Sequence, residues 1–195
     1  MTTSNQSYAS IDPGVSGAIA IFSYVGQLQH LVDMPTIQTT KGKSKKGAVL
    51  DRAAIVDLLL LHAVDHVFIE LSQARPARRG GQSVTPGIVS TGSYMRNYGI
   101  LVGICAGLQI RCTEITPAKW KRKVMSGMSK DKGASIIRAS ELYPEIRLIR
   151  KKNHNKADAV LIGWYAATEI LRIFANSNVI ELKAAIPGTA TQKGR

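Results

Sequence analysis

Three acidic residues stand in apolar stretches of the chain, where an ordinary protein core would hold none. Asp12 lies in YASIDPGVSGAIAIF, Glu70 in HVFIEL and Asp158 in NHNKADAVLIGWYAA. A carboxylate removed from water is costly unless it is paired or coordinates a metal ion. Carboxylate oxygens are hard ligands, and metal sites built from them serve phosphate chemistry. The three acids together therefore predict one convergent metal site that acts on a phosphate.

Each acid also has an ordinary structural explanation. Asp12 is in an Asp-Pro-Gly turn, where aspartate is common. Glutamate is depleted in buried strands, so Glu70 has the stronger claim to function, and its ordinary alternative is an ion pair with an arginine such as Arg75. Asp158 could be a first-turn acid favoured by the helix dipole. The metal interpretation rests on all three acids together.

The composition indicates a globular chain with a polyanionic partner. Its 195 residues suffice for one domain with a real core, and 45% are hydrophobic while 20% are charged. The formal net charge is +13, and the sequence pI is about 10.0. Such an excess favours nucleic acid, and the clustering of the basic residues argues against a generally solubilising surface.

Cysteine usage and targeting signals narrow the setting. Cys105 and Cys112 are expected to be buried thiols in a reducing compartment, and their spacing fits no zinc pattern. No apolar run is long enough to predict a membrane span, and the first ten residues do not resemble a secretory signal. We expect the cytoplasm of a prokaryotic or phage-infected cell, or an organelle matrix if a transit peptide has been removed.

The order of apolar stretches predicts an α/β domain over residues 8–176, after a flexible N-terminus at 1–7 and before a mostly disordered tail at 177–195. A meander of three strands is followed by a helix and a fourth strand, which places Asp12 and Glu70 side by side near strand ends. Asp158, near the start of the last helix, could close the site. The predicted strands are 8–12, 17–24, 27–34, 67–71 and 109–115. The predicted helices are 51–62, 93–108, 117–124, 130–142 and 155–174, with a basic loop at 41–46 and a long loop at 72–93.

Several stretches in this order resemble a known family. SIDPGVSGAIAI, VFIELSQARP, YGILVGICAGL, TPAKWKRKVMSGMSKDKGASIIRASELYP and RKKNHNKADAVLIGWYA span most of residues 8–170. They resemble RuvC-type Holliday junction resolvases of the RNase H-like superfamily, above all the plastid type with its bacterial and phage relatives. The resemblance implies a five-stranded mixed sheet flanked by helices and a homodimer. It also implies two Mg²⁺ or Mn²⁺ ions held by Asp12, Glu70 and Asp158, with Asp12 bridging both.

The fourth metal-site residue departs from the bacterial pattern. Bacterial resolvases carry Asp or His three positions before the last Asp, where this chain has Asn155. The plastid-like group carries His four positions before its last acid, which matches His154. Both offsets face Asp158 on a helix. We favour His154, as a neutral ligand or a proton carrier, with Asn155 as a helix N-cap. In the alternative, Asn155 replaces a catalytic Asp and weakens the site.

Basic residues flank the acids and predict phosphate contacts. They are Lys119, Lys121, Arg122, Lys123, Arg150, Lys151 and Lys152. Trp120, among the first four, is more typical of a core than of a stacking platform. The resemblance implies that Lys130 or Lys132 stabilises transition-state charge.

The long loop is the candidate for the junction centre, although it could be a plain linker. Arg75, Arg78 and Arg79 could grip phosphates, and Gln82 or Ser83 could read exposed bases. Residues 94–108 are the candidate dimer interface, or they pack on their own sheet.

We therefore predict a structure-selective DNA endonuclease that resolves four-way junctions by two symmetric nicks. The alternatives are an RNase H-like nuclease on other branched DNA or RNA–DNA hybrids and a catalytically weakened junction-binding protein. A sugar-kinase-like or actin-like ATPase is disfavoured because the chain lacks room for the second domain and phosphate loop.

Overall fold

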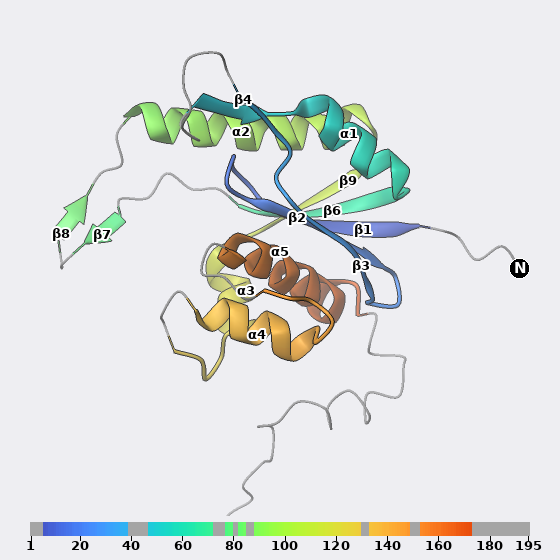
Figure 1. The fold of residues 1–195 in the computed structure, drawn as a ribbon, viewed down its shortest axis with the longest axis vertical. Helices are drawn as coiled ribbons and strands as arrows, with labels where there is room; N and C mark the ends of the chain where they lie inside the picture. Colours follow the sequence, from blue (N-terminus) through green and yellow to red (C-terminus); the bar gives the residue numbers. More distant parts are fainter. Residues whose placement is uncertain are drawn as a thin grey trace, which may run out of the picture.

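A mixed sheet of five strands, in the order β3-β2-β1-β6-β9, forms the centre of the computed structural model (Figure 1). β1 pairs antiparallel with β2 and parallel with β6, and β6 pairs parallel with β9. The strands are β1 (Ser7–Asp12), β2 (Ala18–Ser23), β3 (Leu28–Asp33), β6 (Val64–Glu70) and β9 (Arg111–Ile115). The structure describes residues 6–38, 47–71, 77–79, 82–84, 88–129, 133–148 and 153–172, and side chains are not described for 77–79, 82–84 and 88–90.

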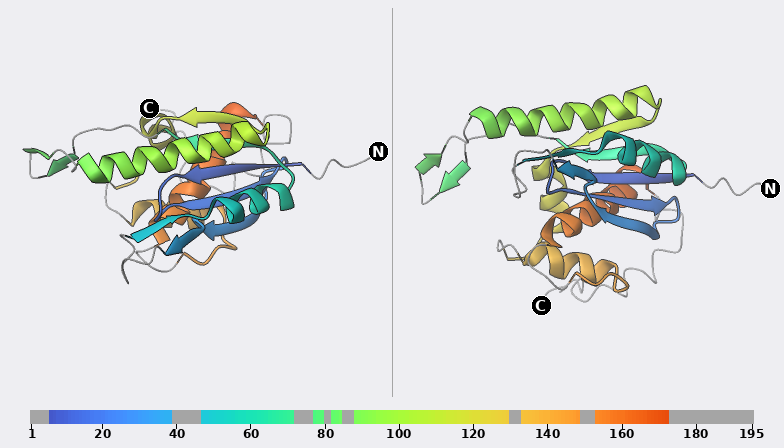
Figure 2. Two further views of the ribbon diagram at one scale, coloured as in Figure 1. Left: turned by 90° about the horizontal axis from the view of Figure 1, so that it is seen from above. Right: turned by 45° about the horizontal axis from the view of Figure 1, so that its top comes forward.

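Helices cover both faces of the sheet, which confirms the predicted α/β class (Figures 1 and 2). α1 and α2 lie on one face, and α3, α4 and α5 lie on the other. The helices are α1 (Arg52–Leu61), α2 (Ile88–Gly107), α3 (Pro117–Val124), α4 (Ala134–Leu142) and α5 (His154–Tyr165), which continues into the π-helical turn η3 (Ala166–Ile170).

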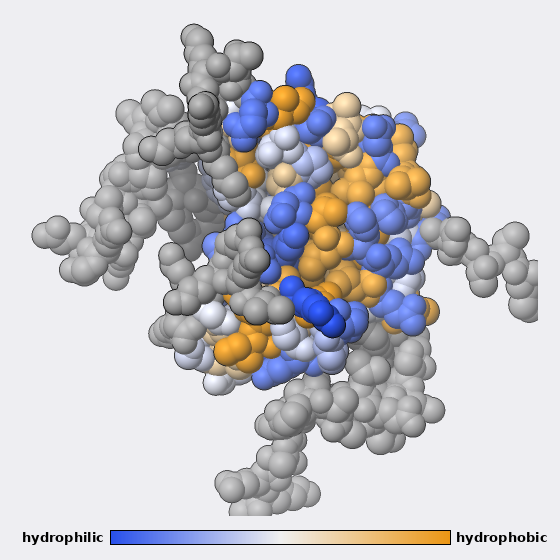
Figure 3. Space-filling view, viewed as in Figure 1, coloured by the Kyte–Doolittle hydropathy of each residue, from blue (hydrophilic) through white to orange (hydrophobic). Residues whose placement is uncertain are grey.

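Strand alternation divides the core into two clusters. Ala9, Ile11 and Ile69 pack with α1 and α2, whereas Tyr8 and Phe68 pack with α3, α4 and α5. This division follows from the two-residue period of a strand, in which successive side chains point to opposite faces. β3 and β9 are the edge strands of the sheet. Figure 3 shows apolar residues in a band across the middle of this view, bordered by hydrophilic residues.

Two small hairpins add to the predicted elements. β4 (Thr36–Gln38) pairs with β5 (Ala48–Leu50), on either side of the predicted basic loop at 41–46, which lies outside the described residues. β7 (Ala77–Arg79) pairs with β8 (Gln82–Val84) inside the stretch predicted as a long loop. Both figures place this second hairpin beyond the beginning of α2, at the end of the sheet where β6 stops.

Several predicted boundaries are wrong. α2 begins at Ile88 rather than at 93, so it takes up part of the predicted loop. β6 begins at Val64, three residues before the predicted start at 67, because its first residues also pair with β1. α4 begins at Ala134 rather than at 130, and α5 begins at His154 rather than at 155. Most of the predicted N-terminus, at 1–5, and the tail at 177–195 lie outside the described residues, whereas Ser7 belongs to β1.

Two further expectations concern the thiols and the membrane. Cys105 on α2 is buried, Cys112 on β9 is half-buried, and both are free. In the described part of the chain, no helix combines the length and the apolar character needed to cross a bilayer.

Candidate functional site

Asp12 and Glu70 meet because they end two parallel strands at the same edge of the sheet. Ile11 pairs with Ile69, so the next residue of each strand, which is also its last, lies at the same level of the sheet. Asp12 follows the parity of Tyr8, and Glu70 follows that of Phe68, so both acids face the layer of α3 and α5. This confirms the predicted neighbourhood of the two acids.

The loop after Asp12 is tight. Gly17 N donates to the Gly14 carbonyl over 3.0 Å, and a Cβ at Gly17 would collide with the Asp12 carbonyl. The chain therefore turns back into β2 immediately after the acid and keeps Asp12 at the sheet edge.

Asp158 reaches the same edge because α5 packs closely on β1 and β2. Ser10 Oγ donates to the Ala159 carbonyl over 2.7 Å, which ties the residue after Asp158 to the middle of β1. A Cβ at Gly163 would collide with the Phe22 ring, so glycine is what allows this approach. Asp158 is the fifth residue of α5, so the alternative explanation of this residue as a first-turn acid does not hold.

The electrostatics show that the three carboxyl groups interact. Burial, followed by the charges of Glu70 and Asp158, raises the pKa of Asp12 from 3.8 to about 8. Burial is also the main cause that raises the pKa of Glu70 and that of Asp158. Carboxyl groups whose pKa is raised by burial, and at Asp12 and Glu70 also by a neighbouring carboxylate, are typical of functional sites.

Within the described part of the chain, Lys121 is the lysine or arginine whose charge acts on all three acids of this cluster. Its Nζ lies 3.9 Å from Asp158 Oδ2, and half of its side chain is exposed (50%). Its charge lowers the pKa of all three acids, against the larger effect of burial. Lys121 was predicted as a phosphate contact, and the structure places it inside the acid cluster.

Trp120 is the hydrogen-bond partner of Glu70. Its Nε1–H donates to Glu70 Oε2 over 2.6 Å, and this bond lowers the pKa of the carboxyl group. Trp120 is fully buried, so its prediction as a core residue is confirmed. Sequence reasoning missed its contact with the acid, and Arg75, the expected partner, lies outside the described residues.

Two further groups lie around Asp158. The Ser135 hydroxyl on α4 forms a hydrogen bond with its carboxylate, and both this bond and the nearby charge of His154 lower the pKa of Asp158. His154 is therefore near the acid cluster, as predicted. Ser135 was missed, because nothing in GASIIRAS distinguishes this serine from a surface residue.

Asn155 does not cap α5, so that prediction is wrong. The N-cap residue is Asn153, and Asn155 lies inside the first turn. Its Nδ2 donates to the Ser16 carbonyl in the loop that follows Asp12. Next to it, Lys156 Nζ pairs with Asp33 Oδ2 over 3.1 Å. The start of α5 is thus tied to the strands that carry the site.

The donor set fits a hard divalent cation, although the side chains do not yet converge on one point. Among the described residues, no three His, Cys, Asp or Glu side chains are close enough to hold an ion as they stand. Glu70 is turned towards Trp120, and Asp158 towards Lys121 and Ser135. Three interacting carboxylates nevertheless provide the oxygen ligands and the negative charge that Mg²⁺ or Mn²⁺ requires.

The predicted basic residues separate into three groups. Lys119 and Arg122 on α3 are exposed. Lys123 is exposed too, but its Nζ pairs with Glu169 Oε1 over 3.1 Å. The remaining basic residues have no described side chain. Outside the described residues lie Arg75, Lys130, Lys132, Arg150, Lys151 and Lys152. The backbone alone places Arg78 and Arg79 in β7, and likewise the predicted base-reading residues Gln82 and Ser83 in β8.

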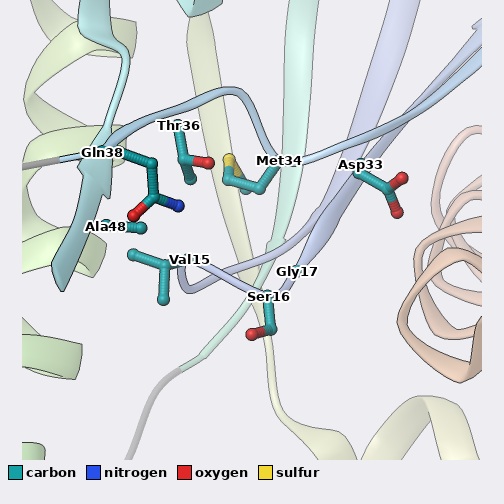
Figure 4. A pocket seen from close by; sticks show the side chains of 8 residues that line it. All are labelled: Val15, Ser16, Gly17, Asp33, Met34, Thr36, Gln38 and Ala48. Atoms are coloured by element: carbon teal, nitrogen blue, oxygen red, sulfur yellow. The ribbon is translucent and has the colours of Figure 1, made fainter. Parts of the chain in front are cut away.

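A pocket of about 120 Å³ lies near the site but is separate from it (Figure 4). Val15, Ser16 and Gly17 line it on one side, and Met34, Thr36 and Gln38 on the other. None of the three acids lines this pocket, so the pocket is not part of the acid cluster.

Solved structures identify the fold. T. thermophilus RuvC in complex with a Holliday junction substrate is similar with a TM-score of 0.53 and 14% identity, over 84% of this chain and 96% of that chain. A second Thermus thermophilus RuvC structure gives a TM-score of 0.52 and 11% identity, over 84% and 95%. No protein-family model and no curated protein sequence matches the chain. The chain therefore has the RNase H-like fold of RuvC.

Proposed function

We propose that the protein is a DNA endonuclease that resolves four-way junctions by paired symmetric nicks. The observation that carries the proposal is the meeting of Asp12, Glu70 and Asp158 at one edge of an RNase H-like sheet, where burial raises the pKa of each acid and a neighbouring carboxylate adds to the rise at Asp12 and Glu70. The similar fold of a RuvC solved with a Holliday junction substrate supports the choice of nucleic acid.

The three acids would hold the metal ions, and His154 would complete the site as the fourth group. Paired Mg²⁺ or Mn²⁺ ions would activate a water for in-line attack on the phosphate and stabilise the leaving oxygen. The donors fit because they are hard oxygen ligands with uncompensated negative charge. Asn155 would have a structural role instead, because its Nδ2 donates to the Ser16 carbonyl in the loop after Asp12.

Lys121 would balance the charge of the site. Its ammonium group is half-exposed and 3.9 Å from Asp158, so one side contacts the acids while the other is open to DNA. A lysine at this place can stabilise negative charge that develops on a phosphate. Lys121 would then take the role that the resemblance implies for Lys130 or Lys132, both of which lie outside the described residues.

The exposed basic residues would bind the DNA backbone around the acids. Lys119 and Arg122 lie on α3, the helix that also carries Trp120 and Lys121. The β7–β8 hairpin stands at the same end of the sheet and is suited to reach the junction. The net charge of +13 would draw the protein to DNA and make binding strongly salt-dependent.

A homodimer through α2 would match the near two-fold symmetry of the junction. Gly99, Gly103 and Gly107 recur every fourth residue and are exposed. Among the described residues, no atom lies within 4 Å of a Cβ built at any of them. Each glycine destabilises an isolated helix by about 1 kcal/mol relative to alanine, so such a row is better explained by a second helix that approaches closely.

A comparison of three substrates tests the proposal. A synthetic four-way junction, an RNA–DNA hybrid and a plain duplex are each incubated with the protein, with and without Mg²⁺, and the products are resolved on a denaturing gel. We expect symmetric nicks in two opposed junction strands that require Mg²⁺, and none with Glu70→Gln. Cutting of the hybrid alone would favour the alternative of an RNase H-like nuclease. Tight binding of the junction without cutting would favour the alternative of a catalytically weakened junction-binding protein.

The dimer has its own test. Gly103→Leu adds a side chain where the protomer has room, so the protomer should keep its thermal stability or gain some. The same side chain should block close helix contact and weaken the dimer in sedimentation experiments. A protein that sediments as a monomer before the substitution would contradict the dimer.

A further inference from the structure

Trp120 differs from an ordinary core tryptophan in what its polar and aromatic parts contact. The indole N–H donates to Glu70 Oε2 over 2.6 Å. The Nζ of Lys121 lies 4.9 Å from the centre of the indole rings. One fully buried side chain therefore contacts both an acid of the site and the cation beside it.

The hydrogen bond fixes the orientation of the Glu70 carboxylate. A distance of 2.6 Å is at the short end for an N–H donor and a charged oxygen, where hydrogen bonds are strong. A glutamate side chain has three rotatable bonds, and a strand end alone would not select one orientation. With Oε2 held by the indole, Oε1 is left for the space shared with Asp12 and Asp158.

The backbone around Trp120 is well suited to hold the ring still. α3 begins with Pro117 at its first position, and Trp120 N donates to the Thr116 carbonyl over 3.5 Å. Val124, one turn later, is also fully buried. Glu70 on β6 pairs with Ile115 on β9, and Ile115 lies only two residues before α3. The indole and the carboxylate are thus carried by adjacent rigid elements.

We propose that Trp120 is a positioning residue: its N–H presets the Glu70 carboxylate for a divalent cation, and its ring supports the ammonium group of Lys121. The inference rests on the proposed function of the acid cluster. Partners that orient a metal ligand from behind are often as important as the ligand, and their loss costs about 10–100-fold in metal affinity or activity. The simpler alternative is a core tryptophan whose N–H only needs an acceptor.

An isosteric replacement separates the two explanations. The chain has two tryptophans, Trp120 and Trp164. In a Trp164→Phe background, Trp120 is replaced by β-(3-benzothienyl)alanine, which keeps the bicyclic ring but puts sulfur where the N–H was. Trp120→Phe is compared in parallel. Trp164→Phe alone is the matched control, because Trp164 packs against the same core cluster on α5.

The decisive measurement is the Mg²⁺ concentration that gives half-maximal junction cutting. We expect loss of the N–H to raise it about 10–100-fold, with thermal stability in EDTA close to that of the control. A core tryptophan without a positioning role would alter thermal stability and leave the Mg²⁺ requirement unchanged. An unchanged requirement in the isostere, with cutting intact, would overturn the inference and leave the function standing.

A second readout does not depend on cutting. In protein labelled with ¹⁵N at the indole nitrogen, Mg²⁺ should shift the Trp120 signal, leave the Trp164 signal in place, and have no effect on either in Glu70→Gln. This pattern would support the positioning role even if no junction were cut, in which case only the proposed function fails. A Trp120 signal that ignores Mg²⁺ in the wild-type protein would overturn the inference.

Discussion

β6 carries an acidic residue near its start and another at its end, and their surroundings differ. Near the start, Asp65 Oδ1 accepts a 2.5 Å hydrogen bond from the Tyr24 hydroxyl, and Asp65 Oδ2 lies 3.8 Å from Arg111. At the end, Glu70 shares its surroundings with two other carboxylates, and the half-exposed Lys121 is the lysine beside them in the part of the chain that the structure describes. The first acid is matched by its partners, whereas the second belongs to a cluster with excess negative charge.

The difference distinguishes an acid that is matched within the fold from the acid that we propose to be functional. Asp65 and Arg111 compensate each other, so the fold needs no further ion at that end. At the other end, the described residues place three carboxylates beside one ammonium group and the nearby imidazole of His154. Buried like charges oppose folding unless something neutralises them. A bound divalent cation would supply the missing positive charge, which makes the imbalance itself a reason to place the chemistry there.

The largest expected effect comes from neutralising one acid of the cluster. Asp12→Asn, Glu70→Gln or Asp158→Asn should each lower the rate of junction cutting by about 10³-fold or more, because several kcal/mol of metal-dependent stabilisation are lost. Junction affinity, measured by gel shift in Ca²⁺, should be retained. Wild-type cutting by any of the three variants would remove that acid from the site.

Asp65→Asn at the opposite end is the matched control. It should leave cutting unchanged and lower the free energy of unfolding by about 1 kcal/mol, because the charge-assisted contact with Tyr24 is weakened. Equal loss of cutting in Asp65→Asn and Glu70→Gln would mean that the two ends of β6 do not differ in function.

The sequence predicted the part of the site that follows from local pattern. Alternation within two strands and their ends at Asp12 and Glu70 sufficed to bring those acids together. Trp120, Lys121 and Ser135 could not be assigned in the same way. Their contacts depend on how α3 and α4 dock beside the strand ends, which no periodicity encodes.

The fold shows the same limit. Strong apolar periods gave the five strands of the sheet and their order of appearance, but the β7–β8 hairpin lies in a stretch rich in Gly, Pro, Ser and Arg that reads as a loop. Pairing of such short strands depends on backbone hydrogen bonds that leave little trace in composition. The start of α2 at Ile88 was missed for a related reason, because glycines and β-branched residues lower helix propensity there.

Without metal, titratable groups beside the two ends of β6 should change the stability of the protein in opposite directions as the pH changes. The pKa of Asp12 is raised from 3.8 to about 8, so the folded state holds a proton that the unfolded state has released. Stability from this group is therefore greatest at low pH and is lost as pH rises towards about 8. The pKa of His66, near Asp65, is lowered from 6.5 by burial and by the charge of Arg111. The contribution of His66 to the stability of the folded state is therefore lost as pH falls below 6.5.

Thermal unfolding in EDTA at several pH values checks these signs. Asp12→Asn should flatten the decline in melting temperature on the alkaline side, and Mg²⁺ should restore stability there in the wild-type protein but less so in the variant. His66→Gln should alter the acidic side alone. A wild-type melting temperature that rises steadily up to pH 8 in EDTA would contradict the imbalance at Asp12.

Asn155→Asp tests a smaller effect beside the cluster. The amide donates to the Ser16 carbonyl, and a carboxylate cannot make that bond. We expect no gain in cutting and a loss of at most a few-fold, since the loop after Asp12 loses one contact while another like charge is added. A clear gain in the rate of cutting under saturating Mg²⁺ would instead indicate that Asn155 stands in for a catalytic acid.

The smallest expected effect extends the comparison of matched and unmatched charges to α3. Lys123 is paired with Glu169 at 3.1 Å, whereas Arg122 is exposed and has no ion-pair partner among the described residues. A phosphate contact made by Arg122 releases a counterion, so Arg122→Gln should reduce the slope of log affinity against log salt by about 1. Lys123→Gln should change the slope less, because its charge is already compensated in the free protein. Equal slopes for the two variants would mean that the partner in the free protein does not decide which basic residue meets DNA.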